Sequence, residues 1–142
     1  MNMASKKRGS GPHPNRGEVA IERTEAGHGT FIFAIAGELD LGSAPQLKWA
    51  VSNELRAGAR HVVVDLGQVT FMDSTAIGVL VGIDRSLAEG QWLALANLQP
   101  DVHMTFEVTG LDSAFQLFGT VEEALARSAE LQSEPGDQVQ SS

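Results

Sequence analysis

Residues 61–66 are the part of the sequence that most constrains the fold. They read His-Val-Val-Val-Asp-Leu, so three valines follow one another without the alternation of apolar and polar residues that a half-buried strand shows. A run of this kind is typical of a strand that is covered on both of its faces, as in a parallel sheet. We therefore expect this strand at the centre of the sheet.

The segments around this strand alternate between strand and helix patterns. β-branched and aromatic residues predict strands over residues 19–24, 30–36 and 92–98, and residues 115–118 form a further short apolar element. Helical spacing predicts helices from Ser43, as the N-cap, to Gly58, from Ser74 to about Ala88, over 100–108 and over 121–131. A hairpin followed by alternating strands and helices indicates an α/β domain with a mixed sheet.

The length and charge indicate one acidic domain between two tails. The chain has 142 residues, and we predict a domain over 18–132, a flexible basic tail over 1–17 and a flexible polar tail over 133–142. The whole chain carries a net charge of −8, of which the first tail contributes +4 and the last −2, leaving −10 for the domain. An acidic domain is a poor nucleic-acid binder and suits a basic protein partner.

The composition argues against several classes of site. The chain has no cysteine, so disulfides and thiolate chemistry are excluded. The absence of cysteine is also consistent with a reducing compartment. Its four histidines are isolated and lack ligand spacing, so we expect no metal and no cofactor. The sequence has no apolar stretch typical of a secretory signal or a membrane span. We therefore expect a cytoplasmic protein that does not bind a membrane.

The segment after the central strand carries the strongest functional signal. Residues 62–83 indicate a buried strand, a loop and a helix whose first turn holds Ser74 and Thr75. At the carboxyl edge of an open α/β sheet, a phosphate on Ser74 would meet free helix amides and the positive end of the helix dipole. It would also add about −1.5 to −2 charges beside Asp73 and near Asp65 and Asp40. The simpler alternative is that Asp73 or Ser74 is only a stabilising N-cap.

The helix that follows Ser74 is unusually apolar. Residues 76–83 contain no polar side chain, and Ile77, Val79 and Val81 lie outside the core-facing stripe. These three side chains either pack inside the domain or form an exposed docking patch. We favour burial, because Gly78 and Gly82 suggest the close approach of another backbone.

Four motifs, in this order and spacing, resemble a known family. They are Gly-Glu-Leu-Asp at 37–40, Val-Val-Asp-Leu at 63–66, Phe-Met-Asp-Ser-Thr-Ala-Ile-Gly-Val-Leu at 71–80 and Thr-Gly-Leu-Asp at 109–112. The sequence resembles the bacterial anti-sigma factor antagonists built on the STAS domain. The resemblance implies one STAS-like domain with a mixed sheet and helices packed mainly on one face. The sequence departs from the commonest pattern of this family at Ala76, where glycine is frequent.

The resemblance also implies a function and a site. Ser74 would be phosphorylated by an anti-sigma factor of the histidine-kinase-like serine kinase type, and a metal-dependent serine phosphatase would reverse this. The unmodified protein would bind the anti-sigma factor and release the sigma factor, without being an enzyme. The partner-binding surface implied by the resemblance comprises Asp40, Asp73, Ser74, Thr75, Ile77 and Gly78. A homodimer is left open.

The sequence also allows three rival interpretations. A receiver-type phosphorelay domain would use Asp65, but it needs clustered carboxylates and a late lysine, and Lys48 is the only lysine in the predicted domain. A serine enzyme would need the nucleophile elbow Gly-x-Ser-x-Gly, which the residues around Ser74 do not form, and His103 is its only candidate base. The third interpretation keeps the STAS fold and makes the chain a scaffold or regulatory module of a stress-sensing, transporter or lipid-transport complex.

Overall fold

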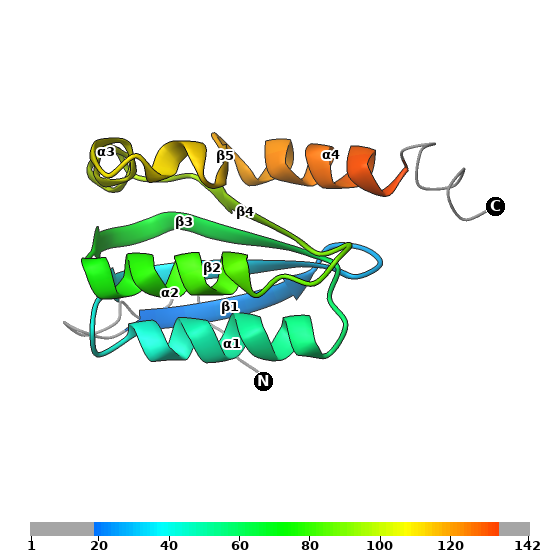
Figure 1. Ribbon diagram of the computed structural model, residues 1–142, viewed down its shortest axis with the longest axis horizontal. Coiled ribbons are helices and arrows are strands. Elements are labelled where there is room, and N and C mark those ends of the chain that lie inside the picture. Colours follow the sequence, from blue (N-terminus) through cyan, green and yellow to red (C-terminus); the bar gives the residue numbers. More distant parts are fainter. Residues whose placement is uncertain (1–18, 134–142) are drawn as a thin grey trace.

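The computed structural model describes residues 19–133, which form one five-stranded sheet with helices on both faces (Figure 1). The strand order is β1-β2-β3-β4-β5. β1 pairs antiparallel with β2, and the other neighbours are parallel. The strands are β1 Val19–Glu25, β2 Thr30–Leu39, β3 His61–Met72, β4 Trp92–Ala96 and β5 Gln116–Phe118. The predicted mixed sheet with a central 61–66 strand is confirmed.

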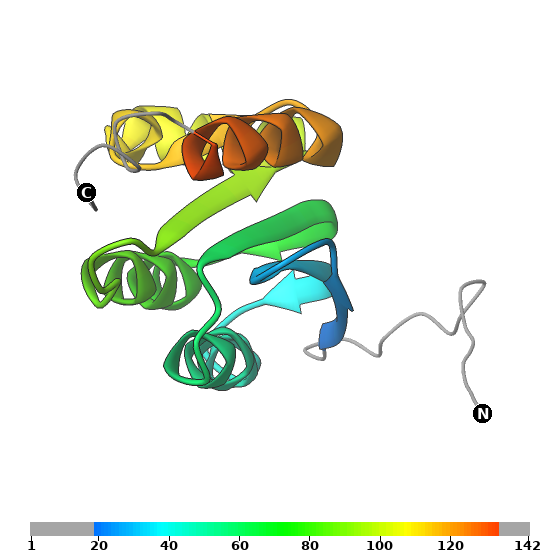
Figure 2. The same ribbon diagram turned by 90° about the vertical axis from the view of Figure 1, so that its right-hand side faces the viewer.

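Three of the four α-helices pack against the same side of the sheet. The helices are α1 Ala44–Arg56, α2 Ser74–Arg85, α3 Pro100–Val108 and α4 Val121–Gln132. Leu47 of α1, Leu80 of α2 and Phe106 of α3 belong to one core cluster, whereas Ala124 of α4 belongs to a second. Figure 2 shows α4 across the sheet from α1 and α2. Helices mainly on one face were predicted, and this is confirmed.

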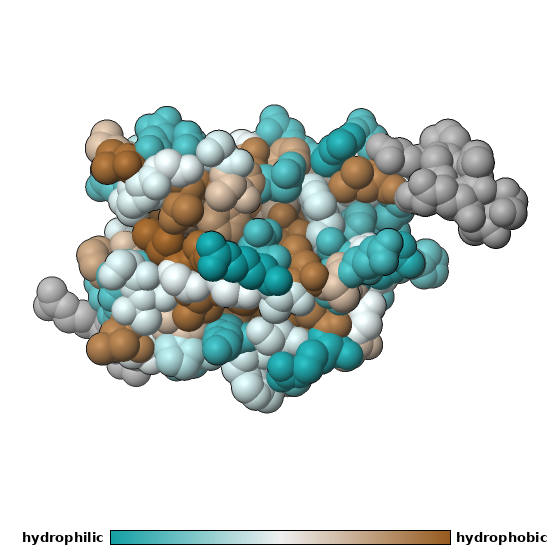
Figure 3. Space-filling model, viewed as in Figure 1, coloured by the Kyte–Doolittle hydropathy of each residue, from teal (hydrophilic) through white to brown (hydrophobic). Residues whose placement is uncertain are grey.

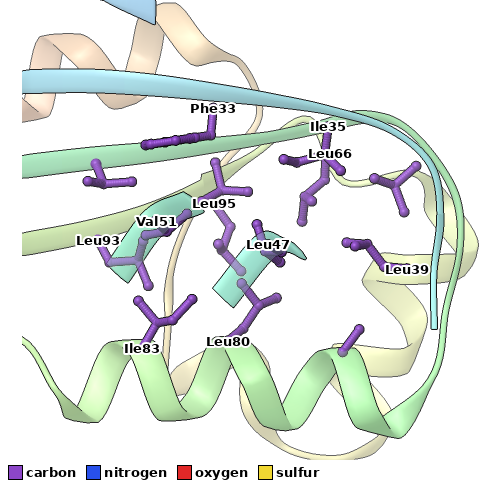
Figure 4. Close-up of a cluster of buried hydrophobic side chains, with 14 of the residues drawn as sticks. Phe33, Ile35, Leu39, Leu47, Val51, Leu66, Leu80, Ile83, Leu93 and Leu95 are labelled. Atoms are coloured by element: carbon purple, nitrogen blue, oxygen red, sulfur yellow. The ribbon is translucent and has the colours of Figure 1, made fainter. Parts of the chain in front are cut away.

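The larger core lies between the sheet and helices α1 and α2 (Figure 4). Phe33 of β2, Leu66 of β3 and Leu95 of β4 are at most 1% exposed and point toward these helices. Burying one such side chain contributes about 1.5–3 kcal/mol, so this layer supplies much of the driving force for folding. It also holds the start of α2 in a fixed place at the end of β3.

Strand β3 is longer than the sequence predicted. We expected it to end at Leu66, but it continues to Met72, where it pairs with Leu39 of β2. Two register irregularities in the β2–β3 ladder, between Ala34 and Ala36 and between Gly37 and Glu38, accompany this extension. The predicted loop is therefore strand, because pairing with the distant segment β2 decides the conformation of these residues.

Several helix and strand ends also differ from the predictions, and β2 continues to Leu39 instead of ending at Ala36. Helix α2 ends at Arg85 instead of Ala88, and β4 ends at Ala96 instead of Leu98. Ser43 stands at the N-cap of α1, as predicted, but its side chain makes no capping bond. Its hydroxyl instead donates to the Glu38 carbonyl at 2.6 Å, and the Asp40 carboxylate accepts from the Ser43 amide at 3.1 Å.

The two predicted tails, 1–17 and 133–142, lie outside the described residues except for Ser133, and the domain limits 18 and 132 stay predictions. Within residues 19–133, no helix is long and apolar enough to cross a membrane.

Side-chain hydrogen bonds connect α4 to strands β2 and β3. His61, at the start of β3, is 4% exposed, and its Nδ1 lies 2.5 Å from the Ser128 hydroxyl. Gln132 lies 3.3 Å from the same nitrogen and donates to the Thr30 hydroxyl at 2.9 Å. Burial, and secondarily the charge of Arg60, lowers the pKa of His61 below its usual value of 6.5. The neutral imidazole is therefore the form that fits these contacts.

We predict that lowering the pH destabilises the protein through His61. Because the folded state holds this pKa below 6.5, the unfolded state binds more protons as the pH falls through 6.5. The contribution of His61 is thus complete above that pH and is lost below it. The free energy of unfolding, measured by urea denaturation at a series of pH values, should fall more steeply in the wild type than in His61→Gln. His103→Gln is the control, because the His103 side chain is 45% exposed. Equal pH slopes for wild type and His61→Gln would contradict the prediction.

Candidate functional site

Ser74 is the first residue of α2 and is exposed at the carboxyl edge of the sheet. The preceding residues belong to β3, which ends at Met72, so the strand leads into the helix through Asp73 alone. The core described above fixes both elements, and the hydroxyl is accordingly presented to solvent by rigid structure rather than by a long loop. This placement agrees with the one predicted from the sequence.

Asp73 joins two parts of the site through one carboxylate. Its Oδ1 accepts from the Ala76 amide at 3.0 Å, which caps α2, and its Oδ2 accepts from the Leu41 amide at 3.1 Å. The Asp73 amide also donates to the Leu39 carbonyl at 3.1 Å. The N-cap interpretation of Asp73 is therefore correct. The same carboxylate also holds the β2–α1 loop beside Ser74.

Asp40 lies in that β2–α1 loop and stabilises it internally. Its Oδ1 accepts from the amides of Gly42 and Ser43 at 3.0 and 3.1 Å. The loop is thus a tight turn closed by a carboxylate, and the Leu41 amide bond brings it against Asp73. As predicted, Asp40 and Asp73 lie on adjoining loops at the edge where Ser74 is exposed.

The start of α2 has free donors for an anion. The first amides of a helix have no partner within it, and they lie at the positive end of the helix dipole. Asp73 occupies the Ala76 amide through its side chain and the Ile77 amide through its carbonyl. Among residues 19–133, no hydrogen bond uses the amides of Ser74 or Thr75. A phosphate on the Ser74 hydroxyl would therefore find local donors.

The other predicted partner-binding residues differ in their exposure. Thr75 is half-buried and Gly78 is exposed, whereas Ile77 is 9% exposed and belongs to the larger core. The structure gives the Ile77 side chain a packing role, and a contact of Ile77 with a partner stays a prediction. Val79 and Val81 are partly buried and also pack against the core, so the favoured burial is confirmed for Ile77 and in part for the two valines.

The reason given for Gly78 and Gly82 was wrong. Both glycines are exposed, and a Cβ atom added at either would meet nothing within 4 Å. No backbone within residues 19–133 approaches them closely. Each glycine still costs the helix about 1 kcal/mol relative to alanine, and packing inside the described chain does not offset this cost.

Two exposed apolar residues near Ser74 were missed by the sequence reasoning. Leu41 is 72% exposed, and its amide is the one bound by Asp73. Phe71, three residues before Ser74, is 49% exposed. We use the name switch surface for Leu41, Phe71, Ser74, Thr75 and Gly78. No local sequence pattern marks these two residues as exposed, because their exposure depends on which elements cover them.

The residues of the rival interpretations have other roles. Oδ1 of Asp65 accepts from the Gly67 amide at 3.0 Å and from the Asn97 side chain at 3.1 Å. Asp65 is therefore a hydrogen-bonded strand carboxylate, but the expectation that it lies near Ser74 at the end of the strand was wrong, because β3 continues from Asp65 to Met72. Nδ1 of His103 lies 3.5 Å from the Glu107 carboxylate on its own helix. Within the described part of the chain, no group of three His, Asp or Glu side chains could hold a metal ion.

The comparison with protein families agrees with the sheet order, the placement of the helices and the exposed serine at the start of α2. Residues 22–124 match the STAS domain model, and the chain belongs to the STAS domain family. The resemblance noted in the sequence is therefore confirmed.

Individual relatives are similar over most of their length. The anti-sigma-B factor antagonist of Listeria monocytogenes is 33% identical over 100 residues, which are 70% of this chain and 88% of the relative. Among solved structures, the anti-sigma factor antagonist SpoIIAA in its unphosphorylated form is 27% identical with a TM-score of 0.67, covering 78% of this chain and 96% of its own. The Bacillus cell fate determinant SpoIIAA in its phosphorylated form is 27% identical with a TM-score of 0.62, covering 77% and 99%.

We predict that Asp73 stabilises the site through two separable hydrogen bonds. Asp73→Ala removes both and should lower the free energy of unfolding by roughly 2 kcal/mol, about half of it from the lost helix cap. Asp73→Asn keeps an oxygen for the Ala76 amide and loses the charged acceptor of the Leu41 amide, so it should cost about 1 kcal/mol. Urea denaturation measures both. Wild-type stability of Asp73→Ala would show that the carboxylate does not hold these elements together.

Proposed function

We propose that this protein is an anti-sigma factor antagonist, which binds an anti-sigma factor through the switch surface and thereby releases a sigma factor. It acts by binding in the cytoplasm and not as an enzyme. The named relatives support this role, since the Listeria protein is an anti-sigma-B factor antagonist and SpoIIAA is an anti-sigma factor antagonist. The observation that carries the proposal is the exposure of Ser74 at the first position of α2.

The chemistry of the surface suits a basic partner. Asp40 and Asp73 place two carboxylates beside Ser74, and the chain as a whole carries a charge of −8. Leu41 and Phe71 supply exposed apolar area of the kind that forms the centre of an interface. A partner with cationic side chains around an apolar centre would complement both features.

Phosphorylation of Ser74 would turn this surface off. The phosphate adds about −1.5 to −2 charges at pH 7 beside two existing carboxylates. The free amides of Ser74 and Thr75 hold the modified state locally, so the phosphate does not unfold the helix. A docked partner would instead have to desolvate a dianion at the centre of the interface, which costs about 2 kcal/mol or more.

The proposed partners are an anti-sigma factor that is a histidine-kinase-like serine kinase and a serine phosphatase. The phosphorylated form of SpoIIAA supports a modified state in the family. Ser74→Ala, used as bait in a lysate of the source organism, should retain a protein with the histidine-kinase-like ATPase fold, identified by mass spectrometry. Recovery of a transporter or of a stress-sensing scaffold, without such a kinase, would contradict the antagonist function and favour a different STAS role.

We predict opposite binding behaviour for two Ser74 variants. Ser74→Ala should bind the purified anti-sigma factor constitutively, because it cannot accept a phosphate. Ser74→Asp places a charge at the switch surface and should bind at least about tenfold more weakly. Calorimetric titration of both variants measures the difference. Equal affinities of the two variants would rule out a charge-controlled interface at this position.

We predict that Ser74, and not Thr75, is the acceptor of the phosphate. Ser74 is exposed, whereas Thr75 is half-buried. After incubation of the wild type with the kinase and ATP, phosphopeptide mapping should place the label on Ser74. Thr75→Val is the matched control and should still be labelled, while Ser74→Ala should not. A label on Thr75 in the wild type would overturn the assignment.

A further inference from the structure

Helix α1 and the C-terminal half of α2 border a groove that the proposed function does not use. Its volume is about 580 Å3, and side chains of both helices line it. Lys48, Ser52 and Arg56 contribute the wall on the α1 side, and Gly82 and Ser86 contribute the wall on the α2 side. Figure 3 shows this face of the molecule, where weakly polar surface follows α2. We call this feature the α1–α2 groove.

The α1–α2 groove concentrates positive charge in an acidic protein. The chain has 18 carboxylates and 10 basic residues. Arg23 and Arg127 of the described part are paired with glutamates. Lys48 and Arg56 form no ion pair within residues 19–133, yet both line the same groove. Two unpaired cations at one concave place favour an anionic occupant.

The spacing of the two cations indicates the size of that occupant. Lys48 and Arg56 are eight residues apart on α1, which separates their backbones by about 12 Å along the helix axis. Ser52, midway between them, adds a hydroxyl to the same wall. A compact anion such as phosphate would be held near one cation, whereas a chain segment with successive carboxylates can reach both.

The opposite wall leaves room for a polypeptide. Gly82 has no side chain, and a Cβ atom there would meet nothing within 4 Å. Ile83 and Leu55, which are almost fully buried, supply apolar surface at the base. A backbone can therefore approach α2 closely while its carboxylates face α1.

The α1–α2 groove also continues the switch surface. Exposed residues follow one another at four-residue steps along α2 and its C-cap. They are Ser74, Gly78, Gly82 and the C-cap Ser86. Residues at this spacing share one face of a helix. A molecule docked at Ser74 can thus extend along α2 into the groove.

We propose that the α1–α2 groove binds an acidic segment of the partner protein that docks on the switch surface. This inference rests on the proposed function for the identity of the partner. The recognition itself is a matter of charge and shape: carboxylates of the segment pair with Lys48 and Arg56, and its backbone lies over Gly82. The carboxylates of Asp40 and Asp73 beside the switch surface, and the two cations of the groove, would then orient the partner between them.

The test uses the full-length protein labelled with 15N and two probes, a peptide of eight glutamates and inorganic phosphate at matched ionic strength. Amide shifts of Ser52, Gly82 and Ser86 should move on adding the peptide, and the affinity should fall as salt is raised. Phosphate should not produce these shifts. If the peptide leaves these amides unmoved, or if phosphate moves them with equal affinity, the proposal is wrong.

Matched variants separate the groove from general charge effects. Lys48→Glu with Arg56→Glu should weaken peptide binding roughly tenfold, whereas Arg127→Glu, on the opposite face of the sheet, should leave it unchanged. Gly82→Gln should block the groove, and Gly78→Gln, one turn away and outside its lining, should not. If the two variants of either pair lost peptide affinity equally, the peptide would not be bound by a defined groove.

A further variant separates this inference from the proposed function. Ser74→Asp should bind the glutamate peptide like the wild type, because Ser74 does not line the groove. If the groove binds the peptide but no anti-sigma factor binds at Ser74, the proposed function fails and the groove stands. If the anti-sigma factor binds at Ser74 and the groove does not bind the peptide, only the inference fails.

Discussion

The site depends on the two hydrogen bonds of the Asp73 carboxylate. One oxygen caps α2 through the Ala76 amide, and the other holds the Leu41 amide of the β2–α1 loop. One side chain therefore positions both the helix that bears Ser74 and the exposed apolar residue beside it. Since α1 follows the same loop, this bond also sets where the two helices begin relative to each other. The geometry of the proposed switch thus follows from one carboxylate between two backbone segments.

This arrangement creates a local conflict of charge that suits a reversible switch. The free amides at the start of α2 favour an anion on Ser74, while the carboxylates of Asp73 and Asp40 oppose one. If Ser74 is phosphorylated as proposed, these two effects would act in opposite directions within the monomer. A docked partner changes this balance, because it removes water that screens the carboxylates. The repulsion between the phosphate proposed for Ser74 and these carboxylates would then be much stronger in the complex than in the free protein.

Sequence periodicity was enough to predict the elements, but not their ends or their surfaces. Valines 62–64 predicted a central strand, and the hydroxyls after it predicted the start of α2, because both signals are local. The extension of β3 to Met72 depends on pairing with β2, and the unused cap of Ser43 depends on hydrogen bonds to Glu38 and Asp40. The exposure of Leu41 and Phe71 depends likewise on which elements happen to cover them. Such features follow from tertiary contacts, and one sequence alone does not encode them in any short window.

Gly78 and Gly82 show how stability and binding separate along α2. Alanine at either position would fit the space and would favour the helix by about 1 kcal/mol. Neither glycine has a turn, a positive φ or a close neighbour within the described chain to explain it. The face of α2 that carries them begins at Ser74 and ends at the α1–α2 groove, and a smooth helix face admits another backbone at short range. Under the proposed function, this stability cost would leave α2 with an exposed face free of side chains at Gly78 and Gly82, on which the partner can pack.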